Sequence, residues 1–423
     1  MNVITRFSWV PLVAGVAFGG QLVFGQTSPP SWGQWGGPDR NFHVSAGRIA
    51  DTWPESGPTQ LWNRALGEGY SSILVDQGLL ITMYREGDDE VVIALDANTG
   101  ATTWQFGYDA PLLNNGYFDV WLNSAGPGPY STPLIAGETV FTVGVNGHFH
   151  ALDKRSGEVR WSHNLVDTFD LLDYNAFASS PLAYGSTVIL PLGGSGHGVV
   201  ALDQETGAIA WRSADFDLAP GSPILINVDG QDQLVVLGQQ ELVGLNPRDG
   251  RRLWNHPHEN ELGLNISMPV WGPDNLLFLS SAYDSGSRLV RLRQIDGHTN
   301  AEEMWFNNRI RLHFGNALRI DNVVLGSTGD FGPAFMAGLD IETGRELWRE
   351  RSFARAHMLY ADNKLVIVDE DGEVAVASLT ADGLHVHARR KILTENAWTP
   401  PTLADSILYI RDRKNILALD LSG

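Results

Sequence analysis

Residues 94–104 read Ala-Leu-Asp-Ala-Asn-Thr-Gly-Ala-Thr-Thr-Trp, and variants of this phrase return along the whole chain. The other clear copies begin at Ala151, Ala201 and Gly338, and a fifth copy, which begins at Gly244, has Asn in place of Asp. The leucine recurs at positions 95, 152, 202, 245, 292, 339, 379 and 419, so that one repeat is 40 to 57 residues long. A period of this size is typical of solenoids, propellers and other repeat arrays.

The residues within one repeat predict four short β-strands. Runs such as residues 139–143 (TVFTV) are β-branched and aromatic and are bounded by Gly, Asn or Asp, which indicates hairpins. The Asp-x-x-Thr-Gly part is a turn, because Asp caps nearby amides and Gly accepts a positive φ. The Trp that follows can fill a gap between neighbouring sheets. Since one such sheet cannot bury both its faces, the sequence predicts sheets stacked radially in a β-propeller.

The two ends of the chain predict how the ring closes. The eighth copy, at residues 418–420, ends the chain before a Trp can follow, whereas Gln60–Asn63 is a lone Trp strand near the start. Pairing them predicts an all-β, eight-bladed propeller of four-stranded antiparallel blades with three-plus-one closure. An open array is the alternative, but it would expose its edge strands. The tryptophans expected to dock one blade on the next are Trp62, Trp104, Trp161, Trp211, Trp254, Trp305 and Trp348.

The charge and the cysteine content of the chain argue against several classes of binding partner and of site. The chain has 49 acidic and 29 basic side chains and a net charge of −20, which argues against binding nucleic acid or an anionic membrane surface through overall charge. It contains no cysteine, so that disulfides, cysteine-ligated metal sites and thiol catalysis are excluded.

The N-terminus predicts export. Arg6 is followed by residues 7–25, which carry no ionised side chain. This pattern is typical of a cleaved Sec-type signal peptide, although an uncleaved membrane anchor is the alternative because the stretch approaches spanning length. We expect a signal peptide or anchor over 1–25, an extended Trp-, Gly- and Pro-rich arm over 26–57 and the propeller over 58–423. The propeller would then be periplasmic or secreted, with membrane anchoring only through the N-terminal segment.

The repeated phrase resembles the tryptophan-docking motif of the pyrroloquinoline-quinone (PQQ) repeat propellers. That superfamily includes the quinoprotein alcohol dehydrogenases and the outer-membrane barrel-assembly factor BamB. Residues 32–40 (WGQWGGPDR) and Trp53-Pro54 also resemble exported PQQ-like repeat proteins of bacteria. The resemblance covers nearly all of the chain after the N-terminal segment. It implies the fold rather than an activity, because the motif joins blades and does not itself bind quinone.

The resemblance leaves two classes of function open. One is a monomeric, non-catalytic scaffold that is similar to BamB and binds protein partners or extracellular ligands through rim loops, with no cofactor, metal or catalytic residue. The other is a PQQ-dependent oxidoreductase acting on alcohols or sugars, which would need PQQ and calcium on the ring axis. Because cysteine is absent, the chain has neither the vicinal disulfide of many such enzymes nor the lipid-bearing cysteine of a barrel-assembly lipoprotein.

The longest insertion between repeats lies between Trp104 and Pro133 and is rich in aromatic residues. Aromatic anchors dominate the energetics of protein interfaces, so that this insertion is the candidate partner-binding loop. Its candidate contact residues are Tyr108, Tyr117, Phe118 and Trp121. The alternative is that the insertion folds back over the funnel or over a blade edge.

A small polar group opens each inner strand, as in Ser71-Ser72 and Ser179-Ser180. Its recurrence places it around the central channel, where small residues fit because eight strands crowd one axis. His357 and Trp398 break this pattern and are the candidate residues for contact with a ligand at the channel mouth.

Three histidine pairs are spaced two residues apart, so that both rings of a pair lie on one face of a strand. Two imidazoles can reach one metal ion, but the sequence indicates no third ligand for any pair. The pairs are His148/His150, His256/His258 and His385/His387.

Overall fold

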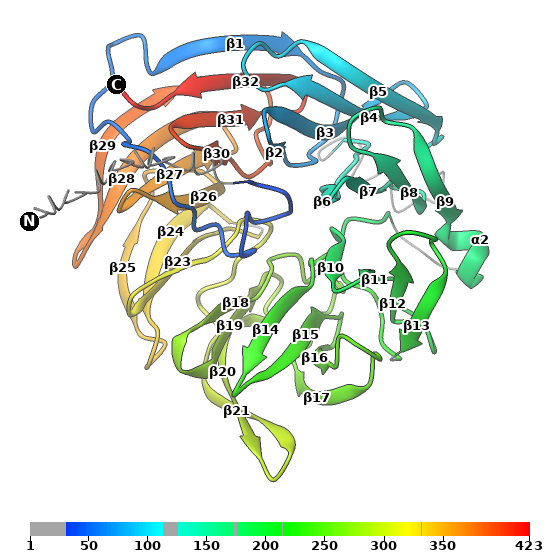
Figure 1. Cartoon of the computed structure of the whole chain (residues 1–423). Helices are drawn as coiled ribbons and strands as arrows, with labels where there is room; N and C mark the ends of the chain where they lie inside the picture. The colour runs from blue at the N-terminus through cyan, green and yellow to red at the C-terminus, as the bar shows by residue number, and fades with distance from the viewer. Residues whose placement is uncertain (1–30, 113–125, 172–175, 214, 331) are drawn as a thin grey trace, which may run out of the picture.

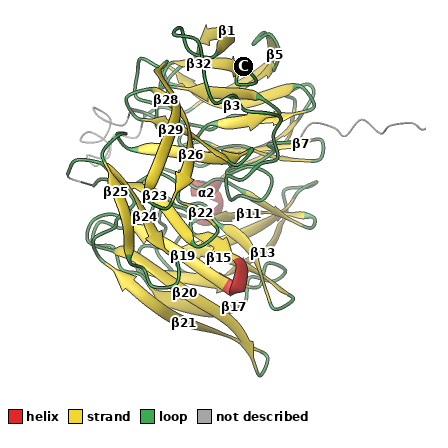
Figure 2. Ribbon diagram, turned by 90° about the vertical axis from the view of Figure 1, so that its left-hand side faces the viewer, coloured by secondary structure: helices red, strands yellow, loops and turns green. Residues whose placement is uncertain are grey.

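The computed structural model describes residues 31–112, 126–171, 176–213, 215–330 and 332–423. In these residues, strands β1 to β32 form eight four-stranded antiparallel sheets, arranged as the blades of one ring (Figure 1). Figure 2 shows strands and loops almost throughout, with short helical segments in red. Within the described ranges, no helix is long and apolar enough to cross a membrane. The predicted eight-bladed propeller is therefore confirmed.

The first four blades follow the chain in order. Blade 1 consists of β2 (Leu74–Asp76), β3 (Leu79–Glu86), β4 (Asp89–Asp96) and β5 (Thr102–Asp109). Blade 2 consists of β6 (Leu134–Ala136), β7 (Thr139–Val143), β8 (His148–Asp153) and β9 (Val159–Asn164), after which comes α2 (Leu165–Phe169). Blade 3 consists of β10 (Leu182–Tyr184), β11 (Thr187–Pro191), β12 (Val199–Asp203) and β13 (Ile209–Ser213). Blade 4 consists of β14 (Ile224–Val228), β15 (Gln231–Leu237), β16 (Glu241–Leu245) and β17 (Arg252–Pro257).

The remaining blades complete the ring. Blade 5 consists of β18 (Val270–Gly272), β19 (Leu276–Ser281), β20 (Gly286–Ile295) and β21 (His298–Asn307), with η1 (Pro273–Asn275) after β18. Blade 6 consists of β22 (Leu318–Ile320), β23 (Val323–Thr328), β24 (Phe335–Asp340) and β25 (Glu346–Glu350). Blade 7 consists of β26 (Ala356–Ala361), β27 (Lys364–Asp369), β28 (Glu373–Thr380) and β29 (Gly383–Lys391). Blade 8 consists of β30 (Thr402–Ala404), β31 (Ile407–Arg411), β32 (Asn415–Asp420) and β1 (Thr59–Ala65).

The two ends of the chain share blade 8. Strand β1 pairs antiparallel with β32, so that Trp62 lies opposite Ala418 and Ala65 lies opposite Asn415. Figure 1 shows this pairing as a blue strand beside a red one. The predicted three-plus-one closure is confirmed, and it joins residues that are at least 350 positions apart in the sequence.

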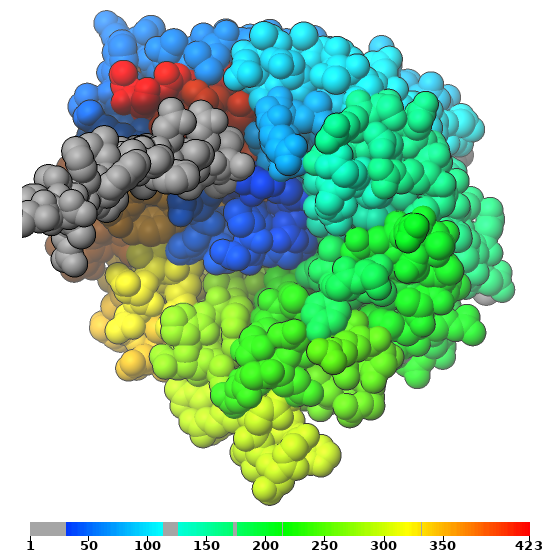
Figure 3. All heavy atoms as spheres, viewed as in Figure 1, coloured from blue at the N-terminus to red at the C-terminus, as the bar shows by residue number. Residues whose placement is uncertain are grey.

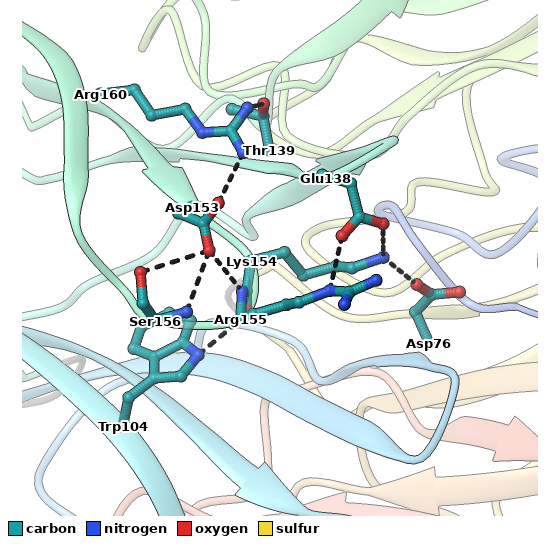
Figure 4. Close-up of polar contacts among 9 residues, drawn as sticks. All are labelled: Asp76, Trp104, Glu138, Thr139, Asp153, Lys154, Arg155, Ser156 and Arg160. Carbon is teal, nitrogen blue, oxygen red and sulfur yellow. Dashed lines mark hydrogen bonds and ion pairs between the residues drawn. The ribbon is translucent and has the colours of Figure 1, made fainter.

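The Asp of each clear repeat, or Asn246 in blade 4, closes the turn before the outer strand. In blade 2, the Asp153 carboxylate accepts hydrogen bonds from the backbone N–H groups of Arg155 and Ser156, both at 3.0 Å (Figure 4). The Arg160 guanidinium lies 2.6 Å from the same carboxylate, and with the Ser156 N–H it lowers the pKa of Asp153 to about 2. Gly157 completes the turn with a φ of 74°, a conformation that favours glycine.

The repeat Trp docks on the next blade through that same glycine. The Trp104 indole N–H of blade 1 donates to the Lys154 carbonyl of blade 2 at 2.9 Å (Figure 4), and a Cβ atom at Gly157 would lie only 2.5 Å from the ring. The glycine is therefore needed twice, for the turn and as the surface on which the indole rests. The other tryptophans that lie against the motif glycine of the following blade are Trp62, Trp161, Trp211 and Trp305.

Trp254 and Trp348 are also buried, and a Cβ at Gly383 of blade 7 would lie 3.8 Å from the Trp348 ring, but both indoles lie closer to a glycine of their own blade. Each indole packs over a glycine on the neighbouring strand of its own blade, because a Cβ at Gly244 or Gly338 would lie 2.1 or 2.4 Å from it. The Trp254 indole N–H donates to the Gln233 side chain of its own blade at 2.6 Å. The physical reason lies in the following blades, 5 and 7, whose degenerate repeats around Leu292 and Leu379 lack the turn, begun by Asp or Asn and ending in Gly, that receives the indole elsewhere.

Replacing Gly338 by Ala is expected to destabilise the propeller by about 1–3 kcal/mol, because the new methyl group overlaps the Trp348 ring. Urea unfolding of the purified chain measures the change. The matched control is Gly107→Ala on outer strand β5, where a Cβ would meet only Val91 at an ordinary 3.7 Å. In a Trp348→Ala background the Gly338→Ala penalty should vanish, and a penalty that persists would contradict the steric explanation.

The arm crosses the end of the ring that faces the viewer in Figure 1. Backbone hydrogen bonds join Trp32 to Val75 of blade 1 (2.8 and 3.1 Å), Gly33 to Ile135 of blade 2 (2.7 Å) and Phe42 to Tyr360 of blade 7 (2.9 Å). Trp32 and Phe42 are each only 1% exposed. Figure 3 shows the blue atoms of this segment over the centre of the ring. The described part of the predicted arm thus closes one end of the central channel.

Candidate functional site

A cavity of about 800 Å³ lies on the axis of the ring. Its walls come from the segments just before the inner strands and from loops between the two middle strands of several blades, and Trp35 of the arm also lines it. The arm is bonded near the far ends of the inner strands, at residues such as Val75 and Ile135, whereas wall residues such as Tyr70 and Tyr130 precede those strands. The cavity is therefore a pocket with the arm at its closed end.

Hydrogen bonds between inner strands shape the wall of the cavity. The backbone N–H of Ser72 donates to Thr132, that of Thr132 to Ser180, and that of Ser180 to Ser222, at 3.0, 3.0 and 2.9 Å. These four residues open blades 1 to 4 in turn. Asn316 exchanges two hydrogen bonds of 2.8 Å with the Met358 backbone in the same way between blades 6 and 7. The small polar groups that the sequence singled out thus link neighbouring blades.

Aromatic rings from widely separated parts of the chain line the cavity together. The ring centroids of Tyr70 and Trp398 lie 5.3 Å apart, and those of Tyr70 and Tyr130 lie 6.4 Å apart in a stacked arrangement. Phe314 contacts both Trp398 and His357, at 5.0 and 5.8 Å. We call these five residues the axial aromatic cluster. It presents flat, largely apolar surfaces to whatever occupies the cavity.

The two residues predicted at the channel mouth, His357 and Trp398, both line this cavity. His357 is 2% exposed, and neither of its ring nitrogens makes a hydrogen bond of acceptable geometry. Burial lowers the pKa of His357 to about 4, against a smaller opposing effect of the Trp398 backbone, so that the ring is neutral at pH 7. A buried polar ring without a partner is unusual and points to a functional use.

Charges at the inner wall are neutralised by near neighbours. The Arg355 guanidinium pairs with Glu370 at 2.9 Å, and the other oxygen of Glu370 accepts a 3.0 Å hydrogen bond from the Trp398 indole. Asp330 lies 3.4 Å from the Arg311 guanidinium. Two further carboxylates that line the cavity, Asp170 and Asp217, are exposed to solvent.

The neighbouring His313 is also neutral. Its Nε2 lies 2.6 Å from the Tyr283 hydroxyl, and burial lowers its pKa to about 4. Both residues line the cavity. This side of the wall therefore offers uncharged hydrogen-bonding groups beside the aromatic faces.

Tyr108 lies inside strand β5 and not in a free loop. Its hydroxyl donates to the buried Glu90 carboxylate at 2.8 Å, and its ring packs against His148 and His150. This position makes Tyr108 part of the contact between blades 1 and 2. The other predicted contact residues, Tyr117, Phe118 and Trp121, lie outside the described residues.

The histidine pairs form no metal site in the part of the chain that the structure describes, because no three potential ligands gather there. His150 packs under Tyr108 with its pKa lowered to about 4 by burial. His258 Nε2 lies 3.0 Å from the Ser281 hydroxyl, and His387 Nε2 lies 2.7 Å from the Ser378 hydroxyl.

Sequence reasoning missed most of the axial aromatic cluster, although a signal for it was present. In blades 1, 2 and 8 an aromatic residue comes immediately before the small polar group, at Tyr70, Tyr130 and Trp398, and Phe314 lies two residues before Asn316. All four of these aromatic residues line the cavity. Trp35 carried no such signal, because its place depends on the path of the arm.

Comparisons with known proteins agree with this architecture. A family model described as outer membrane protein assembly factor BamB matches residues 88–331. BamB of Burkholderia pseudomallei (strain K96243) is 23% identical over 356 residues, which cover 74% of this chain and 86% of that protein. The quinohemoprotein alcohol dehydrogenase ADH-IIG of Pseudomonas putida is 27% identical over 223 residues, but these cover only 28% of that protein and 49% of this chain.

Solved structures show the same fold. BamB from Moraxella catarrhalis superposes with a TM-score of 0.61 at 19% identity, covering 86% of this chain and 97% of that one. The quinohemoprotein alcohol dehydrogenase from Comamonas testosteroni superposes with a TM-score of 0.67 at 13% identity, covering 93% and 81%. The fold is thus shared by both kinds of protein, whereas the family match, which spans more than half of the residues, shows that this chain belongs to the PQQ-like propeller family described as outer membrane protein assembly factor BamB.

Proposed function

We propose that this protein is an exported, non-catalytic scaffold that takes part in the assembly of outer-membrane proteins by binding protein partners through its rim. The observation that carries the proposal is the extent of the match to BamB: 86% of the Burkholderia protein is covered. The matching dehydrogenase is covered over 28% of its length only. A scaffold needs a rigid ring with exposed side chains, and the ring here is closed by pairing of its two ends.

The outer rim offers exposed apolar side chains for such binding. The hairpin of β20 and β21 projects from the ring, as the yellow-green protrusion in Figure 3 shows. Ile295 and Phe306 on this hairpin are 50% and 46% exposed. Large exposed apolar residues on a rigid element are typical of protein contact sites.

The axial cavity suits PQQ poorly, which argues against the oxidoreductase alternative. PQQ is an anionic polycarboxylate, yet Arg355, the lining guanidinium, is paired with Glu370. The buried Arg40 of the arm bonds the Pro181 carbonyl and is not among the residues lining the cavity. Among the described residues, no three His, Asp or Glu side chains gather at one place to hold a metal ion. We therefore assign no chemical step to a quinone here.

Deletion of the gene in the native host tests the scaffold function. We expect lower amounts of folded outer-membrane β-barrel proteins, measured by heat-modifiable gel mobility, and recovery when the full chain is restored. The purified chain, incubated with PQQ and Ca²⁺, should reduce no dye in the presence of alcohols or sugars. Unchanged barrel assembly in the deletion strain, or substrate turnover by the purified chain, would contradict the proposal.

The insertion after β5 provides a second test, based on the sequence because its tip lies outside the described residues. The double change Tyr117→Ala and Trp121→Ala is expected to weaken binding of a protein partner by at least about 2 kcal/mol, as for typical aromatic anchors. The melting temperature should stay nearly constant, since the insertion is not part of the repeat. Affinity capture from the host envelope with parent and variant side by side measures the effect. An identical set of partners would remove this insertion from the binding surface.

A further inference from the structure

The axial cavity has the dimensions of a small-molecule site. Its volume of about 800 Å³ lies within the range of roughly 300–1,000 Å³ that such sites occupy. It is backed by Trp35 of the arm and walled by residues from most of the blades. Neither the family match nor the rim contacts of a scaffold require a cavity of this kind.

The walls present aromatic faces at several angles. Tyr70 and Tyr130 are nearly parallel, with 11° between their planes, whereas Phe314 is inclined by 45° to Trp398. Trp398 is fixed by its hydrogen bond to Glu370, so that its face is pre-oriented. Rigid aromatic faces favour a ligand that has flat apolar faces of its own, at little entropic loss on binding.

The same wall contains uncharged polar groups that need partners. His357 is 98% buried and neutral at pH 7, and neither ring nitrogen makes a hydrogen bond of good geometry, although the Trp398 backbone approaches the ring. A neutral imidazole offers one donor and one acceptor, which matches a hydroxyl group of a ligand. The buried Nδ1 of His313 likewise has no partner, although its Nε2 contacts Tyr283. A purely apolar ligand would leave these groups unsatisfied.

The charge of the cavity selects against ions. At the inner wall, Arg355 is neutralised by Glu370 and Asp330 by Arg311. The unpaired carboxylates of Asp170 and Asp217 are exposed, where water screens their attraction for a cation. An anion would be repelled by these carboxylates. Among the lining residues that the structure describes, no unpaired cationic side chain would offset this repulsion.

We propose that the axial cavity binds a neutral saccharide, of the size of a disaccharide. A pyranose ring has apolar C–H faces that stack on Tyr70, Phe314 and Trp398, and its hydroxyl groups supply the partners that His357 lacks. The exposed carboxylates accept hydrogen bonds from hydroxyl groups nearer the solvent. This ligand combines flat apolar faces, hydroxyl groups and zero charge, which are the three properties that the walls require.

Titration of the purified full-length chain tests the proposal. The probes are maltose, cellobiose and diacetylchitobiose as neutral disaccharides, glucuronate as an anion, choline as a cation and cyclohexanol as an apolar ring. Calorimetry and tryptophan fluorescence measure binding. We expect at least one neutral disaccharide to bind with a Kd below about 1 mM and more tightly than each of the other probes.

Two variants connect that binding to the cavity. His357→Phe keeps an aromatic ring but removes both nitrogens, and it should weaken disaccharide binding by about tenfold or more. Because those nitrogens have no partner in the chain, His357→Phe should leave the melting temperature unchanged or higher. Trp398→Ala should weaken binding similarly. The control is Ile209→Ala, an exposed apolar residue on outer strand β13 outside the cavity, which should bind as the parent does.

Three results would overturn the proposal. They are failure of every neutral disaccharide to bind at about 10 mM, tighter binding of choline, glucuronate or cyclohexanol, and unchanged disaccharide binding in folded His357→Phe and Trp398→Ala variants. The outcome is separable from the scaffold function, because barrel assembly in the host does not enter these measurements.

Discussion

A chain that begins at residue 66 should lose the closure of the ring and unfold with much less cooperativity than one that begins at residue 58. Both chains lack the arm, so that the comparison isolates strand β1. Removing β1 strips β32 of its outer partner along the whole strand and leaves only its pairing with β31. It also removes Trp62, whose indole N–H donates to the Ala97 carbonyl of blade 1 at 2.9 Å, and Arg64, which bonds Gly100 at the same distance.

The expected loss exceeds about 4 kcal/mol of unfolding free energy, because truncation of a packed Trp alone costs about 3–5 kcal/mol. The urea m value should also fall, since an open ring unfolds in stages and exposes less surface at each stage. Denaturant unfolding followed by tryptophan fluorescence and by circular dichroism measures both quantities. Coincident, equally steep unfolding transitions for the two chains would show that the pairing of β1 with β32 is not needed to keep the ring closed.

Replacing Trp104 by Ala is expected to destabilise the propeller by about 3–5 kcal/mol. Trp104 is 8% exposed, rests on Gly157 of the next blade and donates to the Lys154 carbonyl. Its loss opens a cavity between blades 1 and 2 and leaves that carbonyl without its partner. The ion pair of the Lys154 ammonium with Asp76 of blade 1, at 2.8 Å (Figure 4), remains and limits the separation of the blades.

Two comparison variants separate packing from other effects. Trp104→Phe keeps most of the apolar volume and removes the indole N–H, so that we expect a loss nearer about 1–2 kcal/mol. Trp121→Ala, in the insertion outside the described residues, is expected from the sequence to be tolerated. Chemical unfolding at one temperature measures all three variants. Equal losses at Trp104 and Trp121 would show that the insertion also contributes to the core.

The sequence alone determined the architecture, because each blade encodes its own strands and turns. The phrase of residues 94–104 contains a turn, a docking Trp and the glycine that receives the Trp of the preceding blade, all within a few positions. Local patterns of this kind need no knowledge of distant contacts. The closure was also accessible, since an incomplete last repeat and a lone Trp strand at the start complement each other.

His357 and Trp398, which the sequence predicted at the channel mouth, both line the cavity. His357 was accessible because it interrupts a repeated pattern: it stands where other blades have a small polar residue. Which way Trp254 and Trp348 would lie was not evident beforehand. Gly244 and Gly338 stand where other copies of the motif have Ala, and they leave room for the indole within the blade. The indole takes this position because the following blade has no motif turn to receive it.

Only the tertiary structure decided the shape and chemistry of the cavity. Tyr70, Tyr130, Phe314 and Trp398 are spread over more than 300 residues and come together because the ring closes. The arm looked like an extended segment, yet Trp32 and Phe42 are buried where the arm bonds blades 1 and 7, and Trp35 between them lines the cavity. Periodicity encodes contacts within a blade and between neighbours, whereas contacts across the axis obey no sequence period and follow from packing alone.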